Sequence, residues 1–240
     1  TFCWICMSTA SELPNKPKLA LFDLDHTLLP LDSDHGWGEF SIAIGWCDQE
    51  AFGRQNDAFF EDYQAGQLNI PDYVRFATAA VVEHGEAEST AAHQRFMDEV
   101  IRPAMKPAAI ELVQKHLNAG DTVVITSATN EFVTGPIAKA FGVQHLLATE
   151  LVRDAKGWFT GEIAGIPNMR EGKVVRMTEW LAERNLRWED VEATFYSDSM
   201  NDVPLLEKVD HPVATNPDAR LRSLAEERGW RIVDLFSEAP

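Results

Sequence analysis

Residues 19–29, LALFDLDHTLL, decide how the rest of the chain is interpreted. The apolar run 19–22 has the length of a short buried strand, and it leads directly into two carboxylates, Asp23 and Asp25. Like charges at the edge of a low-dielectric core repel each other, which raises the free energy of the folded state. A divalent cation held by hard oxygen ligands is the usual way to offset that repulsion. The alternative is an acidic turn that only caps the strand.

The composition is that of a soluble globular protein. The chain has 240 residues, of which 45% are hydrophobic and 25% are charged, enough for one large or two modest domains. Its formal net charge of −17 repels nucleic acids and anionic membranes, so we expect neither as a partner. A site that handles phosphate must therefore carry its own local positive charge.

The N-terminal residues carry no recognisable targeting signal. No run reaches the roughly 18 apolar residues of a membrane span, and residues 1–7 lack the basic segment of a signal peptide. Cys3 and Cys6 form a C-x-x-C with no second half-site, and we interpret them as part of a disordered end. We expect a cytoplasmic protein, and the sequence leaves open whether it forms a homodimer.

The chain divides into a helical stretch and a stretch of alternating strands and helices. Residues 37–102 carry apolar side chains at helical spacing and show no strand signal. From Pro107 onward, strands alternate with helices, which predicts a parallel, doubly wound α/β sheet. We therefore expect a core formed by residues 1–31 and 105–240, with a helical domain of residues 32–104 inserted after the first strand.

Polar side chains stand where the predicted strands end. Ligands of such sheets bind beyond the carboxyl ends of the strands, and Asp23, Ser127 and Asp198 all follow strands. The Ser127 hydroxyl, next to small residues, is suited to bind a phosphate oxygen together with backbone N–H groups. Two alternatives stay open: Ser127 caps the helix that begins at residue 131, or Thr126 supplies the phosphate-binding hydroxyl.

Two later stretches add a cation and a second pair of acids. Lys173 stands at a predicted helix start, where the helix dipole disfavours a positive charge. The alternative is an ordinary solvated lysine. Residues 195–202, FYSDSMND, end a strand in Asp198 and Asp202, which places two hard oxygen ligands for Mg²⁺ on one loop.

Taken in this order, the four stretches resemble the four motifs of the haloacid dehalogenase-like (HAD) phosphatases. The first, D-L-D-H-T, matches the family pattern D-x-D-x-T/V. The resemblance implies that Asp23 is a nucleophile that becomes an aspartyl-phosphate. It also implies that Asp25 is the general acid and base, a second acid that the dehalogenases of the superfamily lack.

The resemblance further implies a Mg²⁺ cofactor and a set of supporting residues. The implied metal ligands are Asp23, Asp25 (through its backbone carbonyl), Asp198 and Asp202. Ser127 and Lys173 would bind the phosphate, with Asn201 and Ala128 in supporting positions. Phosphoserine phosphatases read Ser-Gly-Gly where this chain reads Ser-Ala-Thr at 127–129, which keeps the hydroxyl and changes its neighbours.

The helical insertion resembles the cap of the phosphoserine phosphatase-like branch, which includes histidinol-phosphatase-like members. Asp32 stands nine positions after Asp23, where phosphoserine phosphatases carry a glutamate that faces the substrate ammonium. Asp34 lies close by, and His35 and Trp37, which follow, could line a pocket for a ring. For the two acids the alternative is a solvated loop.

These residues lead to one expected function and two alternatives. We expect a Mg²⁺-dependent phosphatase that hydrolyses a small amine-bearing phosphate monoester, similar to phosphoserine or histidinol phosphate. Arg54 and Arg75 are the cap cations that would meet a substrate carboxylate. A phosphotransferase would use the same intermediate. A phospho-accepting receiver domain is less compatible, because receivers lack both the insertion and the acids at 198 and 202.

Overall fold

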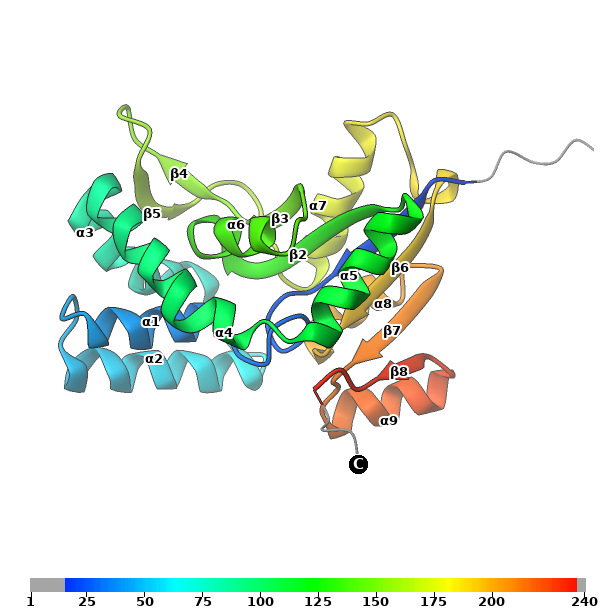
Figure 1. Cartoon of the computed structure of the whole chain (residues 1–240), viewed down its shortest axis with the longest axis horizontal. Coiled ribbons are helices and arrows are strands. Elements are labelled where there is room, and N and C mark those ends of the chain that lie inside the picture. Colours follow the sequence, from blue (N-terminus) through cyan, green and yellow to red (C-terminus); the bar gives the residue numbers. More distant parts are fainter. Residues whose placement is uncertain (1–15, 237–240) are drawn as a thin grey trace, which may run out of the picture.

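The computed structural model describes residues 16–236 and is built around a six-stranded sheet (Figure 1). Neighbouring strands in this sheet are parallel, so the predicted doubly wound α/β fold is confirmed. The strand order is β3-β2-β1-β6-β7-β8. The bounds are β1 Lys18–Phe22, β2 Thr122–Asn130, β3 His145–Thr149, β6 Glu192–Ser197, β7 His211–Thr215 and β8 Arg231–Val233.

Strand β1 lies between β2 and β6. Leu21 pairs with Val124 on one side and with Phe195 on the other. The chain builds one half of the sheet through β2 and β3 and the other through β6, β7 and β8, so the strand order reverses beside β1. A crevice forms at such a reversal, outside the carboxyl ends of the strands. The residues that follow β1, β2 and β6 therefore meet at one edge.

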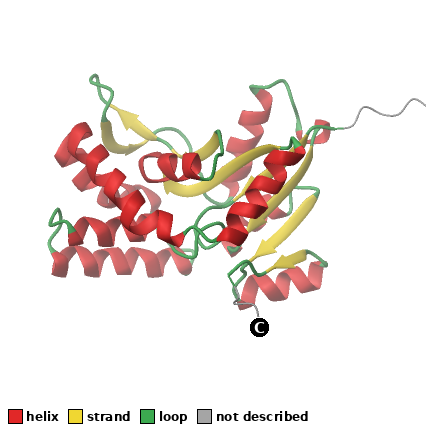
Figure 2. Cartoon of the chain, viewed as in Figure 1, coloured by secondary structure: helices red, strands yellow, loops and turns green. Residues whose placement is uncertain are grey.

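Helices cover both faces of the sheet (Figure 2). The pleat sends Ala20 and Phe22 of β1 to one face and Leu19 and Leu21 to the other. The first face packs against α5 (Pro107–Ala119) and α6 (Glu131–Ala140). The second packs against α7 (Glu171–Ala182), α8 (Val203–Leu206) and α9 (Ala219–Arg228).

The insertion between β1 and β2 is helical. Its elements are α1 (Ser33–Ala43), α2 (Gln49–Gln64), α3 (Ile70–Phe96), a π-helical turn (Met97–Ile101) and α4 (Arg102–Ala104). An antiparallel hairpin of β4 (Leu151–Arg153) and β5 (Phe159–Ile163) lies against α3 (Figure 1). The indole N–H of Trp158 in the hairpin donates to the carbonyl of Val81 at 3.1 Å.

One hydrophobic cluster joins the insertion to the sheet domain. Trp37 of α1 is 1% exposed and packs edge-on against Phe96 of α3 and Phe132 of α6. His93 of α3 stacks on the same indole and bonds the carbonyl of Val133 at 3.0 Å. Because this cluster is continuous with the core under β1, we expect the insertion and the sheet domain to unfold together.

No helix within residues 16–236 is long and apolar enough to cross a membrane. The C-x-x-C of Cys3 and Cys6 lies outside the described part of the chain.

Replacing Trp37 with alanine should destabilise the whole molecule, because it empties the junction of three helices. Loss of a buried tryptophan costs about 3–5 kcal/mol of unfolding free energy. Urea denaturation followed by circular dichroism should show one transition at lower urea. Val82→Ala is the control, since Val82 is 36% exposed. A loss below about 1 kcal/mol, or two separate transitions in the wild type, would contradict the shared core.

Candidate active site

A buried lysine joins two acids that are far apart in the sequence. The Nζ of Lys173 lies 2.7 Å from Oδ1 of Asp23 and 2.7 Å from Oδ2 of Asp202. Lys173 is 2% exposed, so the structure does not place it on the solvated face of a helix. Both acids favour the charged lysine, and its pKa is raised above the ordinary value despite burial.

The start of α7 brings this lysine inside. Gly172 stands against the carbonyl of Pro167, where a Cβ would collide with the backbone. Because glycine has no Cβ, the first turn of α7 can pack directly against the backbone of the loop after β5. Arg170, just before the helix, adopts a positive φ of 53°.

Asp23 follows β1 and is buried beside these charges. Burial raises its pKa to about 6, Lys173 opposes that rise, and Asp202 adds to it. The hydroxyl of Thr27 lies 3.3 Å from Oδ2 of Asp23 and 3.0 Å from Oδ1 of Asp198. The backbone N–H of Asp198 donates back to this hydroxyl at 3.0 Å. Thr27 therefore holds the loops after β1 and β6 together.

Asp25 is buried among hydrogen-bond donors. The N–H of Ser33 donates to its Oδ1 at 2.8 Å, and the Thr129 hydroxyl donates to its Oδ2 at 2.9 Å. Burial raises the pKa of Asp25 well above its usual range, and the nearby charges of Asp32 and Asp23 raise it further. The environment therefore favours the protonated, neutral form of this carboxyl.

The acids at this edge form a donor set suited to Mg²⁺. Burial, Asp23 and Asp202 together raise the pKa of Asp198 well above its usual range. The ammonium of Lys173 pairs with Asp23 and Asp202 but not with Asp198, so the repulsion among the three carboxylates is only partly offset. Thr27 links Asp198 to Asp23, so the three acids lie at the same edge of the sheet. Hard carboxylate oxygens are the ligands that Mg²⁺ prefers, and this donor chemistry fits the cofactor.

Ser127 faces the acids, whereas its neighbour Thr126 does not. The Ser127 hydroxyl lies 3.5 Å from Oδ2 of Asp25 and accepts the N–H of Thr129 at 3.1 Å. The cap of α6 is Asn130, which accepts the N–H groups of two residues in the first turn. Thr126 is turned toward Asn168, whose amide donates to its hydroxyl at 2.9 Å.

A cavity opens beside Asp23, Asp25 and Ser127. Its wall opposite these residues is largely aromatic and comes from the insertion. The lining side chains from the insertion include His35, Phe59, Phe60, Tyr63, Tyr73, Leu68 and Ile70. Among the residues that the structure describes, no lysine or arginine lines this cavity. The cavity thus joins an acidic floor to an apolar, ring-lined wall.

Asp32 and Asp34 both line the cavity, in different environments. Asp32 caps α1 and accepts the N–H of His35 at 2.8 Å. Asp34 is 4% exposed and accepts the Asn130 amide at 3.1 Å. Burial raises the pKa of Asp34 to about 7, Asp32 adds to the rise, and hydrogen bonds from Tyr73 and Asn130 oppose it.

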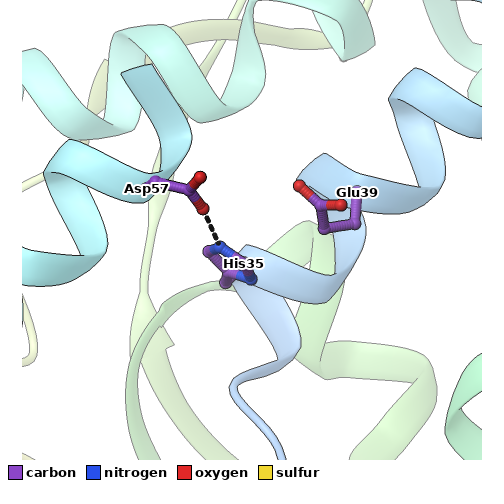
Figure 3. A group of neighbouring side chains, drawn as sticks. All are labelled: His35, Glu39 and Asp57. Carbon is purple, nitrogen blue, oxygen red and sulfur yellow. Dashed lines mark hydrogen bonds and ion pairs between the residues drawn. The ribbon is translucent and has the colours of Figure 1, made fainter. Parts of the chain in front are cut away.

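His35 links α1 to α2 at the rim of the cavity (Figure 3). Its Nε2 lies 3.0 Å from Oδ1 of Asp57, and its ring packs on Phe60 with centroids 4.9 Å apart. Glu39, one turn further along α1, faces the same pair (Figure 3). This ion pair fixes the imidazole so that it lines the cavity.

The two cap arginines point elsewhere. Arg54 pairs with Glu50 at 2.8 Å on the exposed surface of α2. Arg75 pairs with Asp72 at 2.5 Å and with Glu162 of the hairpin at 3.5 Å. Neither arginine lines the cavity, because each is held by acids of the surface. The structure therefore does not bring them to the place where a substrate carboxylate would need a partner.

Sequence reasoning missed several residues that the structure brings to the site. Tyr73 reaches Asp34 from α3, Asn130 reaches it from the end of β2, and Tyr63 lines the cavity from the last turn of α2. The aromatic spacing along α2 and α3 gave the signal of a buried helix face. Nothing in that spacing separates the rings that face a cavity from those that fill the core.

Replacing Asp34 with asparagine should change how stability depends on pH. The unfolded chain ionises near its ordinary pKa of 3.8, whereas the buried carboxyl keeps its proton up to about 7. The free energy of unfolding contributed by Asp34 therefore falls as pH rises from 3.8 to about 7 and is level above it. Urea denaturation should show the wild type losing stability relative to Asp34→Asn across that range.

The matched control is Asp154→Asn in the exposed hairpin turn, which should follow the wild type at every pH. A constant difference between Asp34→Asn and the wild type from pH 4 to pH 8 would mean that this carboxyl does not titrate as its burial requires.

Comparisons with known proteins agree with this arrangement. Residues 20–207 match the sequence pattern of the haloacid dehalogenase-like hydrolase family. The chain is 42% identical over 218 residues to a histidinol-phosphatase of Neisseria meningitidis, covering 90% of this chain and 98% of that protein. It is 33% identical over 229 residues to phosphoserine phosphatase SerB1 of Mycobacterium tuberculosis, covering 90% of this chain and 70% of that protein.

Solved structures give the same result. A Bordetella pertussis Tohama I protein of unknown function is 48% identical with a TM-score of 0.87, covering 92% of this chain and all of that one (100%). A substrate-bound phosphoserine phosphatase shares the fold at 17% identity with a TM-score of 0.64, covering 91% and 93% of the two chains. The chain therefore belongs to the haloacid dehalogenase-like hydrolases, and within that family it is a phosphatase.

Proposed function

We propose that this phosphatase hydrolyses a small phosphate monoester that carries an amine and a ring but no carboxylate, through an aspartyl-phosphate on Asp23. The observation that carries the proposal is the position of Lys173 between Asp23 and Asp202, beside a cavity that also contains Asp25. Residues 32–104 act as a cap over the core, which in the described part of the chain comprises residues 16–31 and 105–236, because α1, α2 and α3 supply most of the cavity wall.

In the first step Asp23 attacks phosphorus. Lys173 holds Oδ1, so Oδ2, which has only the 3.3 Å contact with Thr27, is the freer oxygen for attack. The P–O bond to the alcohol breaks as the Asp23–phosphorus bond forms. The Ser127 hydroxyl, which lines the cavity, would bind a phosphate oxygen, and Lys173, held against Oδ1 of Asp23, would offset the negative charge of the reacting groups. Bound Mg²⁺, held by Asp23, Asp198, Asp202 and the Asp25 carbonyl, would neutralise charge on the phosphate.

Asp25 moves the proton in both steps. Its raised pKa keeps a proton on the carboxyl, which it gives to the leaving alkoxide. The resulting carboxylate then takes a proton from water, which attacks the aspartyl-phosphate and releases inorganic phosphate. The bonds from Ser33 and Thr129 stabilise the carboxylate form and hold it in place between the two steps.

The cavity lining indicates what the alcohol part looks like. Asp32 offers a carboxylate for an ammonium, and the rings of His35, Phe60 and Tyr73 offer flat apolar surface for an aromatic group. A substrate carboxylate would enter an acidic cavity where the described residues supply no lysine or arginine partner. Burying such an unpaired charge is unfavourable. The relative named histidinol-phosphatase, similar over most of both chains, supports this choice over phosphoserine.

The experiment is a panel of phosphate esters assayed for released phosphate with Mg²⁺. We expect kcat/KM for histidinol phosphate to exceed that for phosphoserine by at least about 100-fold, the scale of one unpaired buried charge. Asp23→Asn should abolish turnover of every ester, and EDTA should do so reversibly. Equal rates for the two esters would remove the substrate assignment. Turnover by Asp23→Asn would remove the nucleophile.

Replacing Lys173 with methionine should reduce kcat by at least about 100-fold, as loss of a preorganised charge at a reacting centre does. The ammonium would no longer offset the repulsion between Asp23 and the phosphate. Steady-state kinetics at saturating ester, with a thermal melt of each variant, measure this. Lys139→Met is the control, because Lys139 is exposed on α6. A folded Lys173→Met variant with wild-type kcat would contradict the role.

A further inference from the structure

Three side chains of the sheet domain donate hydrogen bonds to backbone carbonyls in the last turn of α2 and just after it. The Arg170 guanidinium donates to the carbonyl of Gly66, and the Asn201 amide donates to the carbonyl of Tyr63 at 3.5 Å. Arg220 of α9 reaches the carbonyl of Gln64 at 3.5 Å. All three acceptors belong to the end of one cap helix, and all three donors belong to the sheet domain.

These contacts match the chemistry of a helix end. The end of a helix carries partial negative charge, and its carbonyls can accept further hydrogen bonds; the Tyr63 carbonyl, for example, also accepts the N–H of Gly66 at 3.0 Å. Arg170 and Arg220 supply positive charge and donors together. Arg170 also donates from Nε to Oδ1 of Asn201 at 3.3 Å, so the contacts of Arg170 and Asn201 form one network.

The backbone at both sides of the main contact is unusual. Arg170 holds a φ of +53°, a conformation that residues other than glycine rarely adopt. Gly66 has a φ of +72°, and a Cβ there would lie 2.8 Å from the Arg170 guanidinium. Chain geometry therefore brings a strained arginine up to a glycine whose missing side chain leaves room for it.

The fastened turn stands directly over the reacting groups. Tyr63 and Phe60 line the cavity beside Asp23 and also a second cavity that contains Asp198 and Arg170. The two rings thus form the border between the substrate cavity and the space next to the metal-binding acids. Asn201 lies on the same loop as Asp198, three residues further along.

We propose that Arg170, acting with Asn201, is a positioning residue that anchors the end of α2 on the core and so holds Tyr63 and Phe60 over Asp23. Its kinetic consequence rests on the proposed function. Its structural consequence does not, since it concerns only where the cap helix sits. Loss of the anchor lets the border between the two cavities move, so the substrate is held less well above the nucleophile.

The test compares Arg170→Met, which keeps the aliphatic stem, with Arg170→Lys, which keeps the charge. We expect Arg170→Met to lower kcat/KM for the best ester by about 10- to 100-fold, as loss of a charged hydrogen bond does. Arg170→Lys should recover most of that loss. The thermal midpoint should stay within about 2 °C of the wild type in both variants, because the contact holds one helix end and lies outside the shared hydrophobic core. Arg102→Met, an exposed arginine paired with Asp98, is the control and should match the wild type.

Hydrogen exchange separates the anchor from the chemistry. The amides of Ala65, Gly66 and Gln67 are bonded within the last turn, so a peptide covering residues 60–68 reports on it. In Arg170→Met this peptide should exchange at least about tenfold faster while peptides of β1 and β6 stay unchanged. If no ester were hydrolysed, the exchange result would still decide whether Arg170 anchors the end of α2. Unchanged exchange, or a loss of kcat/KM that Arg170→Lys does not recover, overturns the proposal.

Discussion

The ammonium of Lys173, held between Asp23 and Asp202, is the interaction on which the site depends. It brings together the ends of β1 and β6 and the start of α7, elements that the chain forms at widely separated positions. A single buried cation cannot balance the acids around it, as the raised pKa values of Asp23 and Asp198 indicate. The remaining imbalance is what would give the site an affinity for the proposed divalent cation and, through it, for phosphate.

The sheet explains why these groups meet, and the insertion explains what they can act on. Parallel strands whose order reverses at β1 deliver their carboxyl ends to one edge, which places the acids but leaves them open on one side. The helices of residues 33–104 close that side with aromatic rings, anchored through the Trp37 cluster to the same core. Under the proposed function, the sheet domain would therefore set the reaction type and the insertion would set the choice of substrate.

Much of this was predictable, because local sequence carries the information. The strand ending in Asp23, the alternation after Pro107 and the spacing of Asp198 and Asp202 are local patterns, and the fold they predict is confirmed. Lys173 was ambiguous, since its burial depends on the close approach at Gly172, which involves a residue outside its own helix. Arg54 and Arg75 show a different limit. Their neighbouring acids, Glu50 and Asp72, are visible in the sequence, but the local pattern does not say which side of each helix faces the cavity.

The bond from the Ser33 N–H to the Asp25 carboxylate has a mechanical consequence. Ser33 is the first residue of α1, so the inserted helices begin where the carboxyl of Asp25, the proposed proton carrier, is held. An outward swing of α1 would remove that donor while admitting water to the carboxyl, and the two changes act in opposite directions on its acidity. The position of α1 and the pKa of Asp25 are thus coupled through the hydrogen bond from Ser33, which lies eight residues further along the chain.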